Sequence, residues 1–344
     1  MLLAASWFII CACAIPARWP RGGRNMLRRA RTYLAGLGTA SFLLHPYVAW
    51  AAASAQPVPV GFYYGWVTPE TAADVQGYQA IVLGADSESS GYANQQAVEQ
   101  LVSSSPNISF YGYVNLSDGS NPIPMPELAQ EFAEWKALGV RGIFLDLAGA
   151  NYGVPRALRA WAVAQVHALG MRAAVNAWDP MDALGVGLGP GDAYVAEDWY
   201  MVSRQPAVEY PNNAPSRDLA ALNQLEAQGA GVWAVTQENE FTPSITGAEV
   251  ARDVQAMRQV IPMATGFAVG GLNYGADSNA IVPASSIAAA LATSPPAAPS
   301  AQPTSGNAVA SADAALHRAD PLGAKRALIS GFRALFHPLK DGAI

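Results

Sequence analysis

Cysteine and histidine, the residues of thiol and metal chemistry, are scarce in this chain. The 344 residues include two cysteines, Cys11 and Cys13, and both lie in an N-terminal segment that we expect to be cleaved off. The four histidines are His45, His167, His317 and His337. Only His167 lies in the central part of the chain. A Ser-His-Asp hydrolase, a zinc ion bound by cysteine or histidine, and a disulfide are therefore all disfavoured, and we expect no metal and no cofactor.

Charge is also sparse, and its pattern excludes further classes of function. Asp, Glu, Lys and Arg make up 13% of the residues, and the formal net charge is -6. No basic stripe crosses the central region, which argues against nucleic acid as a partner. The sequence has no Gly-x-Ser-x-Gly elbow, no Walker loop and no dinucleotide fingerprint. With 51% hydrophobic residues, the composition is that of a globular protein with a large core.

The first 55 residues have the features of a leader for export. A basic segment, MLRRAR at 26–31, precedes an apolar stretch at 33–48, and Ala53-Ser54-Ala55 offers a cleavage site of small residues. A start at Met26 would give an ordinary signal peptide, so residues 1–20 are either a misassigned start or a second apolar anchor. We expect the mature protein to begin near residue 56 and to be periplasmic or extracellular.

The C-terminal part differs in composition from the rest of the chain. Residues 293–320 are rich in Pro, Ala and Ser, which is typical of a flexible linker. Within 321–344, apolar residues fall at helical spacing among Lys and Arg, which indicates a short amphipathic tail helix. Such a helix can contact a membrane surface or an envelope partner. The plainer alternative is a marginal terminal helix.

A repeated unit fills residues 56–292: an amphipathic helix, a glycine, one to three residues, and an apolar strand. Glycine after the last helical turn closes a helix cheaply. The strands are expected at 60–66, 80–85, 109–115, 142–147, 172–178, 193–199, 232–238 and 266–272. Alternation of strands with helices implies a parallel sheet, and eight strands imply an α/β fold, the closed (β/α)8 TIM barrel. A doubly wound open sheet is the alternative, although the residues after the first strand, GWVTP, are no phosphate-binding loop.

Several of the predicted strands end in polar or aromatic residues. In a TIM barrel the carboxyl ends of the strands form the active face, so residues far apart in the sequence gather there. Two acids are prominent: Asp146 ends the apolar strand GIFLD, and Glu197 lies in the sixth strand. Because burial of an unpaired charge costs several kcal/mol, such an acid must be satisfied, exposed at the rim, or used.

Two carboxylates among aromatic rings are what glycoside hydrolysis requires. We take Asp146 as nucleophile or base and Glu197 as general acid; a separation near 5 Å would indicate retention of configuration, and about 6.5–9.5 Å inversion. The candidate sugar-binding residues are Tyr63, Tyr111, Tyr113, Asn176, Trp178, Asp179, Trp199, Glu238 and Tyr274. Each has a plainer explanation: a rim acid often caps a helix, Asp179 before Pro180 suits an Asx-turn, and the tyrosines can be core residues.

Three segments carry a family resemblance. GIFLDLAGANYG at 142–153, VNAWDP at 175–180 and AEDW at 196–199 resemble the endo-α-1,4-polygalactosaminidase-like glycoside hydrolases, over roughly residues 58–275. That family comprises TIM-barrel proteins related to spherulation-specific proteins and to hydrolase domains that act on galactosamine-rich exopolysaccharides. The resemblance implies that its catalytic Asp and Glu, at the ends of strands four and six, correspond to Asp146 and Glu197. Many members follow the Asp with Glu, whereas this chain has Leu147.

The sequence therefore supports competing hypotheses. The first is an exported, endo-acting glycoside hydrolase that cleaves an α-linked polysaccharide, for which the resemblance implies galactosamine. The alternative is a catalytically inactive TIM barrel that binds carbohydrate at the cell envelope, and Leu147 favours it. A third idea makes the tail the functional part, tethering the barrel to an envelope partner. In each case we expect a monomer whose main partner is a polysaccharide.

Overall fold

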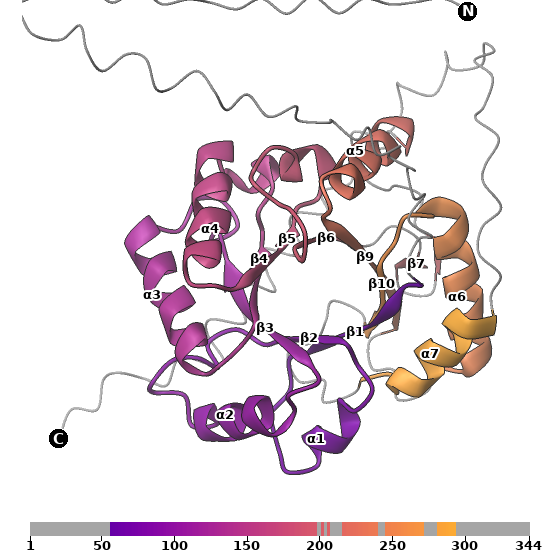
Figure 1. Cartoon of the computed structure of the whole chain (residues 1–344), viewed down its shortest axis with the longest axis horizontal. Helices are drawn as coiled ribbons and strands as arrows, with labels where there is room; N and C mark the ends of the chain where they lie inside the picture. Colours follow the sequence, from indigo (N-terminus) through magenta and orange to yellow (C-terminus); the bar gives the residue numbers. More distant parts are fainter. Residues whose placement is uncertain are drawn as a thin grey trace, which may run out of the picture. The chain divides into compact units, whose positions relative to one another are not determined.

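Eight parallel strands close into a barrel in the computed structural model, which describes residues 56–197, 201–202, 205–206, 215–239, 245–271 and 281–293. The strands are β1 (Val58–Tyr63), β2 (Ala80–Leu83), β3 (Ser109–Asn115), β4 (Gly142–Asp146), β5 (Arg172–Asn176), β6 (Ala193–Glu197), β9 (Gly231–Asn239) and β10 (Gly266–Gly271). Around the ring their order is β1-β10-β9-β6-β5-β4-β3-β2 (Figure 1). The predicted TIM barrel is confirmed, and the open doubly wound sheet is excluded.

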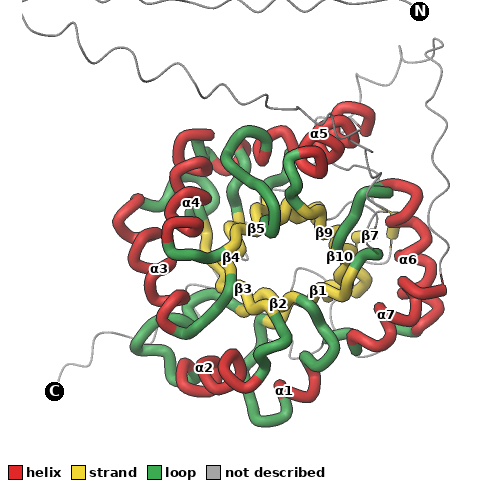
Figure 2. Tube along the Cα trace, in the orientation of Figure 1, coloured by secondary structure: helices red, strands yellow, loops and turns green. Residues whose placement is uncertain are grey.

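The helices lie outside this ring of strands (Figure 2). They are α1 (Thr71–Asp74), α2 (Gln95–Ser104), α3 (Met125–Ala137), α4 (Arg156–Ala168), α5 (Pro215–Ala227), α6 (Gly247–Val260) and α7 (Ala284–Thr293). Gly139, Gly170 and Gly229, which follow α3, α4 and α5, all have positive φ, as the predicted helix ends require. None of the described helices is long and apolar enough to cross a membrane.

Two intervals depart from a regular alternation of strands and helices. Between β5 and β6 the chain forms only a short 3₁₀ helix, η2 (Pro180–Ala183), where a regular barrel has an α-helix. After β6, β7 (Met201–Val202) and β8 (Gln205–Pro206) pair as a small antiparallel sheet. The predicted leader at 1–55 and the residues from 294 onward, with most of the linker and the whole tail, lie outside the described residues.

Two apolar layers sandwich the barrel wall, because side chains alternate along each strand. The outer layer packs the strands against the helices. The inner layer fills the barrel with Val60, Ala80, Val82, Tyr111, Phe144, Ala174, Ala193, Val195, Trp233, Val235 and Ala268. Gly142 lies in the inner layer, where an added Cβ would lie 2.2 Å from the Tyr111 ring, so no larger residue fits. The interior of the barrel is therefore a packed core.

Candidate active site

Each site residue lies two positions after a residue of the inner apolar layer, on the same strand and closer to the carboxyl end. Phe144 is followed by Asp146, Ala174 by Asn176 and Val195 by Glu197, and each of these polar residues ends its strand. Strands β4, β5 and β6 are neighbours in the ring. The alternation therefore brings an acid, an amide and an acid side by side at the mouth of the barrel.

Asn176 joins the two acids. Its Nδ2 donates one hydrogen bond to Asp146 Oδ1, at 2.8 Å, and one to Glu197 Oε2, at 2.9 Å. Because both accepting oxygens bond the same nitrogen, they lie no more than 5.7 Å apart. Carboxyl separations of about 5–5.5 Å characterise retaining glycosidases, whereas inverting enzymes need at least about 6.5 Å.

Tyr113, two residues after Tyr111 in β3, contacts the second carboxylate oxygen of Asp146. Its hydroxyl donates to Asp146 Oδ2 and lies 3.0 Å from Asn115 Oδ1. Burial, followed by the charge of Asp146, raises the pKa of Tyr113 well above its ordinary value of 10.0, so the phenol remains a donor. Both oxygens of Asp146 therefore accept hydrogen bonds.

Sequence reasoning selected Tyr63 in β1, but the neighbouring Tyr64 faces the site. The Tyr64 ring packs edge-on against Tyr113 with centroids 5.6 Å apart. Burial, then the charges of Asp146 and Glu197, raise the pKa of Tyr64 well above 10.0. The side chain of Tyr63 is buried in the outer layer instead, and its hydroxyl contacts the Trp66 carbonyl oxygen at 3.0 Å. A shift of one residue reverses the face, and Tyr64 shares the inward face with Val60, which the structure places in the inner layer.

Tyr111 was also expected to bind substrate, but it lies deeper in the barrel. Its ring packs edge-on against Trp233 at a centroid distance of 5.0 Å, and both belong to the inner layer. It pairs with Gly142 at the start of β4, whereas Asp146 ends that strand. Tyr111 therefore supports the floor of the site and does not reach the mouth.

A small pocket opens beside the acid pair. The residues that line it are Asp146, Tyr152, Asn176, Ala177, Trp178 and Glu197. Tyr152 belongs to η1 (Ala150–Tyr152), and sequence reasoning missed it because only the turn after β4 brings it back over the mouth. The enclosed part of this space, where a water-sized molecule fits, is about 10 Å³, which is the room of about one water molecule. A ligand larger than a few atoms therefore lies mostly outside the pocket.

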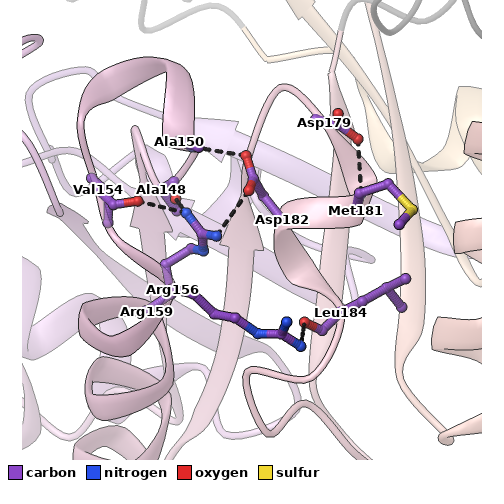
Figure 3. Close-up of polar contacts among 9 residues, drawn as sticks. All are labelled: Ala148, Ala150, Val154, Arg156, Arg159, Asp179, Met181, Asp182 and Leu184. Atoms are coloured by element: carbon purple, nitrogen blue, oxygen red, sulfur yellow. Dashed lines mark hydrogen bonds and ion pairs between the residues drawn. The ribbon is translucent and has the colours of Figure 1, made fainter.

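The loops after β4 and β5, which carry Tyr152 and Trp178, are tied together by polar contacts (Figure 3). Arg159 of α4 donates to Asp182 Oδ1 at 2.8 Å and to the Val154 carbonyl at 2.7 Å. Asp182 Oδ2 accepts the Ala150 N–H at 2.8 Å. Burial lowers the pKa of Arg159, against the opposing effect of Asp182. An almost buried ion pair thus fixes the two loops that flank the catalytic candidates.

Asp179 has the role of a cap. Its side chain accepts the Met181 N–H at 2.9 Å and forms the N-cap of η2 (Figure 3). It does not line the pocket. Of the other expected binding residues, Trp199 and Tyr274 lie outside the described residues, and Glu238 lies in β9 with its side chain outside that description. For these three, substrate binding stays a prediction.

Leu147, where many members of the resembling family have Glu, directly follows Asp146. Its φ is 50°, in the left-handed region that non-glycine residues rarely adopt, and its side chain is buried in the outer apolar layer. Backbone strain of this kind costs about 1–3 kcal/mol and persists where the surroundings impose it. The strained turn redirects the chain immediately after the acid, and the Leu147 side chain packs away from the pocket.

Metal ligands do not gather in the described part of the chain. It contains no group of three or more His, Cys, Asp or Glu side chains placed to hold an ion. His167 of α4 contacts Asp192, which immediately precedes β6, at 2.9 Å. It therefore lies at the opposite end of the strands from Asp146 and Glu197.

Comparisons with known proteins give structural likenesses at low identity. No protein-family model matches the chain, and no curated protein sequence matches it. The glycoside hydrolase domain of PelA from Pseudomonas aeruginosa is similar in structure at 17% identity, with a TM-score of 0.43, over 64% of this chain and 99% of that one. Xylanase 10C from Cellvibrio japonicus is similar at 14% identity and a TM-score of 0.41, over 71% and 72% of the two chains.

The similar structures also differ in the activity that their names give. A D-psicose 3-epimerase, which is no hydrolase by name, is similar at 12% identity and a TM-score of 0.41, over 68% of this chain and 97% of its own. TIM barrels host many unrelated reactions, so function has to be argued from the side chains of the site.

A buried acid outside the pocket makes stability depend on pH. Glu88, in the loop after β2, is 4% exposed, and its Oε2 has no hydrogen-bond partner. Burial raises its pKa from 4.5 to about 9; a backbone hydrogen bond opposes the rise, and the charges of Glu131, Asp86 and Glu134 add to it. Between these two pKa values the folded state keeps a proton that the unfolded state releases, so the free energy of unfolding falls as pH rises.

We expect Glu88→Gln to remove this dependence. At pH 7 the variant should be more stable than the parent by about 3 kcal/mol, and the difference should vanish near pH 4.5. Urea unfolding at several pH values between 4.5 and 9 measures it. Glu99→Gln, on the solvent-exposed side of α2, is the control and should leave the pH profile unchanged. Parallel profiles for the parent and Glu88→Gln would contradict the prediction.

Proposed function

We propose that the chain is a retaining glycoside hydrolase that cleaves an α-linked, amino-sugar-containing polysaccharide at internal bonds. The observation that carries this proposal is the Asn176 amide, which donates to Asp146 and Glu197 together and holds the two accepting oxygens within 5.7 Å of each other, below the separation that inversion needs. An amide that only capped a loop would have no reason to bridge two acids at the mouth of a barrel.

The two acids take different roles in this mechanism. Asp146, bonded on both oxygens, attacks the anomeric carbon while Glu197 gives its proton to the leaving glycosidic oxygen. This step forms a covalent glycosyl ester on Asp146. Glu197, now ionised, then takes a proton from water, and the water oxygen displaces Asp146 from the anomeric carbon. Two displacements restore the original configuration. Asn176 and Tyr113 keep Asp146 aimed at the pocket throughout.

The charge around the mouth supports a cationic substrate. The loops that follow β1 to β5 carry Glu70, Asp86, Asp118 and Asp179, and their described residues include no Lys or Arg. Arg156, which starts α4, donates to the Leu184 carbonyl oxygen at 2.9 Å, and Arg159 pairs with Asp182. Unacetylated amino sugars carry ammonium groups at neutral pH, so this acidic rim attracts them and repels anionic polymers.

Leu147 favours a second candidate function, a barrel that binds such a glycan without cleaving it. We also propose that the leader at 1–55 directs export. We further propose that the tail at 321–344 contacts a membrane surface or an envelope partner.

The decisive experiment measures reducing ends released from α-1,4-galactosaminan, fully N-acetylated and partly de-N-acetylated. We expect release from the partly de-N-acetylated polymer, with the α-anomer as the first product in proton NMR. Glu197→Gln should lower the rate by about 10²–10⁴-fold, because the leaving group loses its acid. A first product in the β-form would exclude retention. Binding without release from either polymer would favour the non-catalytic candidate.

A further inference from the structure

Trp66, in the loop after β1, is exposed at the catalytic face. It is 47% exposed, more than any other aromatic side chain in the described residues. The next residue, Val67, is buried in the outer apolar layer, so the loop is anchored directly beside the exposed indole. A half-exposed indole on an anchored loop offers a flat apolar surface to a ligand.

The loop that carries Trp66 is held firmly to the loop after β2. Asn94, which is buried, accepts the Val67 N–H and donates to the Val67 carbonyl oxygen, both at 2.8 Å. The Tyr63 hydroxyl at the end of β1 also donates to the Trp66 carbonyl oxygen, at 3.0 Å. The ring of Tyr92 lies against the indole with centroids 5.7 Å apart. The indole is therefore a supported platform, which binds a ring at low entropic cost.

The loop that carries Trp66 follows a strand on the far side of the barrel from β5, which lies between the strands of the two acids. In the ring of strands β1 stands opposite β5, so Trp66 and Trp178 follow strands on opposite sides of the barrel. The pocket beside Trp178 is too small for more than a short part of a polysaccharide. A chain that fills the pocket and crosses the mouth meets the Trp66 loop, and Glu70 and Asp86 flank that loop with negative charge.

We propose that Trp66, supported by Tyr92, is a distal subsite that stacks on a sugar ring of the bound polysaccharide, away from the bond that is cleaved. This inference rests on the proposed function. An indole offers the C–H face of a pyranose a flat apolar surface, and an ammonium group on the sugar adds a cation–π attraction. Short ligands do not span the mouth, so the subsite acts only on long ones.

The test compares Trp66→Ala with the parent on partly de-N-acetylated α-1,4-galactosaminan and on its trisaccharide. On the polymer, KM should rise about tenfold with kcat nearly unchanged, and on the trisaccharide both constants should stay the same. Trp66→Phe should recover most of the loss, because it restores a ring. Val260→Ala, which truncates an apolar side chain with 46% exposure at the end of α6, is the matched control and should change nothing.

The outcomes separate the subsite from the reaction. Hydrolysis with equal KM for Trp66→Ala and the parent on the polymer would overturn the subsite and leave the hydrolase. If the parent does not cleave the polymer, titration calorimetry of the parent and Trp66→Ala with the same polymer tests the subsite. Weaker polymer binding by Trp66→Ala then supports the subsite on a non-catalytic barrel, and equal or absent binding overturns it.

Discussion

Asp146→Asn should lower kcat on the polysaccharide by at least about 10³-fold while the protein keeps its fold. The amide cannot attack the anomeric carbon, so the covalent step is lost, and what remains is positioning and the acid Glu197. The site can accept the change: the amide oxygen can take the Asn176 hydrogen bond, and its NH₂ can donate to the Tyr113 oxygen. Tyr113 can then donate to Asn115 Oδ1, which lies 3.0 Å away. We therefore expect a loss of stability within about 1 kcal/mol.

Single-turnover kinetics measure the loss of rate, and urea unfolding measures the change in stability. Asp118→Asn is the matched control, because it makes the same chemical change on the same face of the barrel. Asp118 accepts backbone N–H groups of its own loop and does not line the pocket. Its kcat should stay within about twofold of the parent. Turnover by Asp146→Asn at the rate of the parent would remove Asp146 from the mechanism.

Asp182→Leu should destabilise the protein by about 3–5 kcal/mol, because it leaves the buried guanidinium of Arg159 without its counter-charge. Arg159 has a side chain that is 5% exposed, and its remaining contacts are the carbonyl oxygens of Ala148 and Val154. The same change removes the acceptor of the Ala150 N–H. Since this network holds the loops with Tyr152 and Trp178, activity at temperatures well below unfolding should also fall.

Replacing both partners, Arg159→Met with Asp182→Leu, should return much of the lost stability, because no unpaired charge is then buried. Arg156→Leu is the control from the same helix. Arg156 is exposed and donates to the neutral Leu184 carbonyl oxygen at 2.9 Å, so its loss should cost about 0.5–1.5 kcal/mol (Figure 3). Urea unfolding measures all four proteins. A cost for Asp182→Leu no larger than for Arg156→Leu would show that the ion pair contributes little.

A site residue was predictable where a polar side chain ends an apolar strand, because that pattern is local to the strand. Asp146, Asn176 and Glu197 each end an apolar strand, so their places at the mouth follow from strand ends alone. Tyr63 and Tyr64 differ by one position, and only packing shows which of them faces inward. Tyr111 has the same alternation as Tyr113 but lies one layer deeper, and depth depends on the stagger of strands around the ring.

The sequence alone determined the eight strands, the glycine-ended helices and the acids at the strand ends, because apolar periodicity and helix ends are local properties of the chain. Only the tertiary structure decided that one amide spans both carboxylates and that Tyr64 and Tyr152 join the site. Those facts concern atoms brought together by closure of the barrel, whose spacing is set by packing between residues that are distant along the chain.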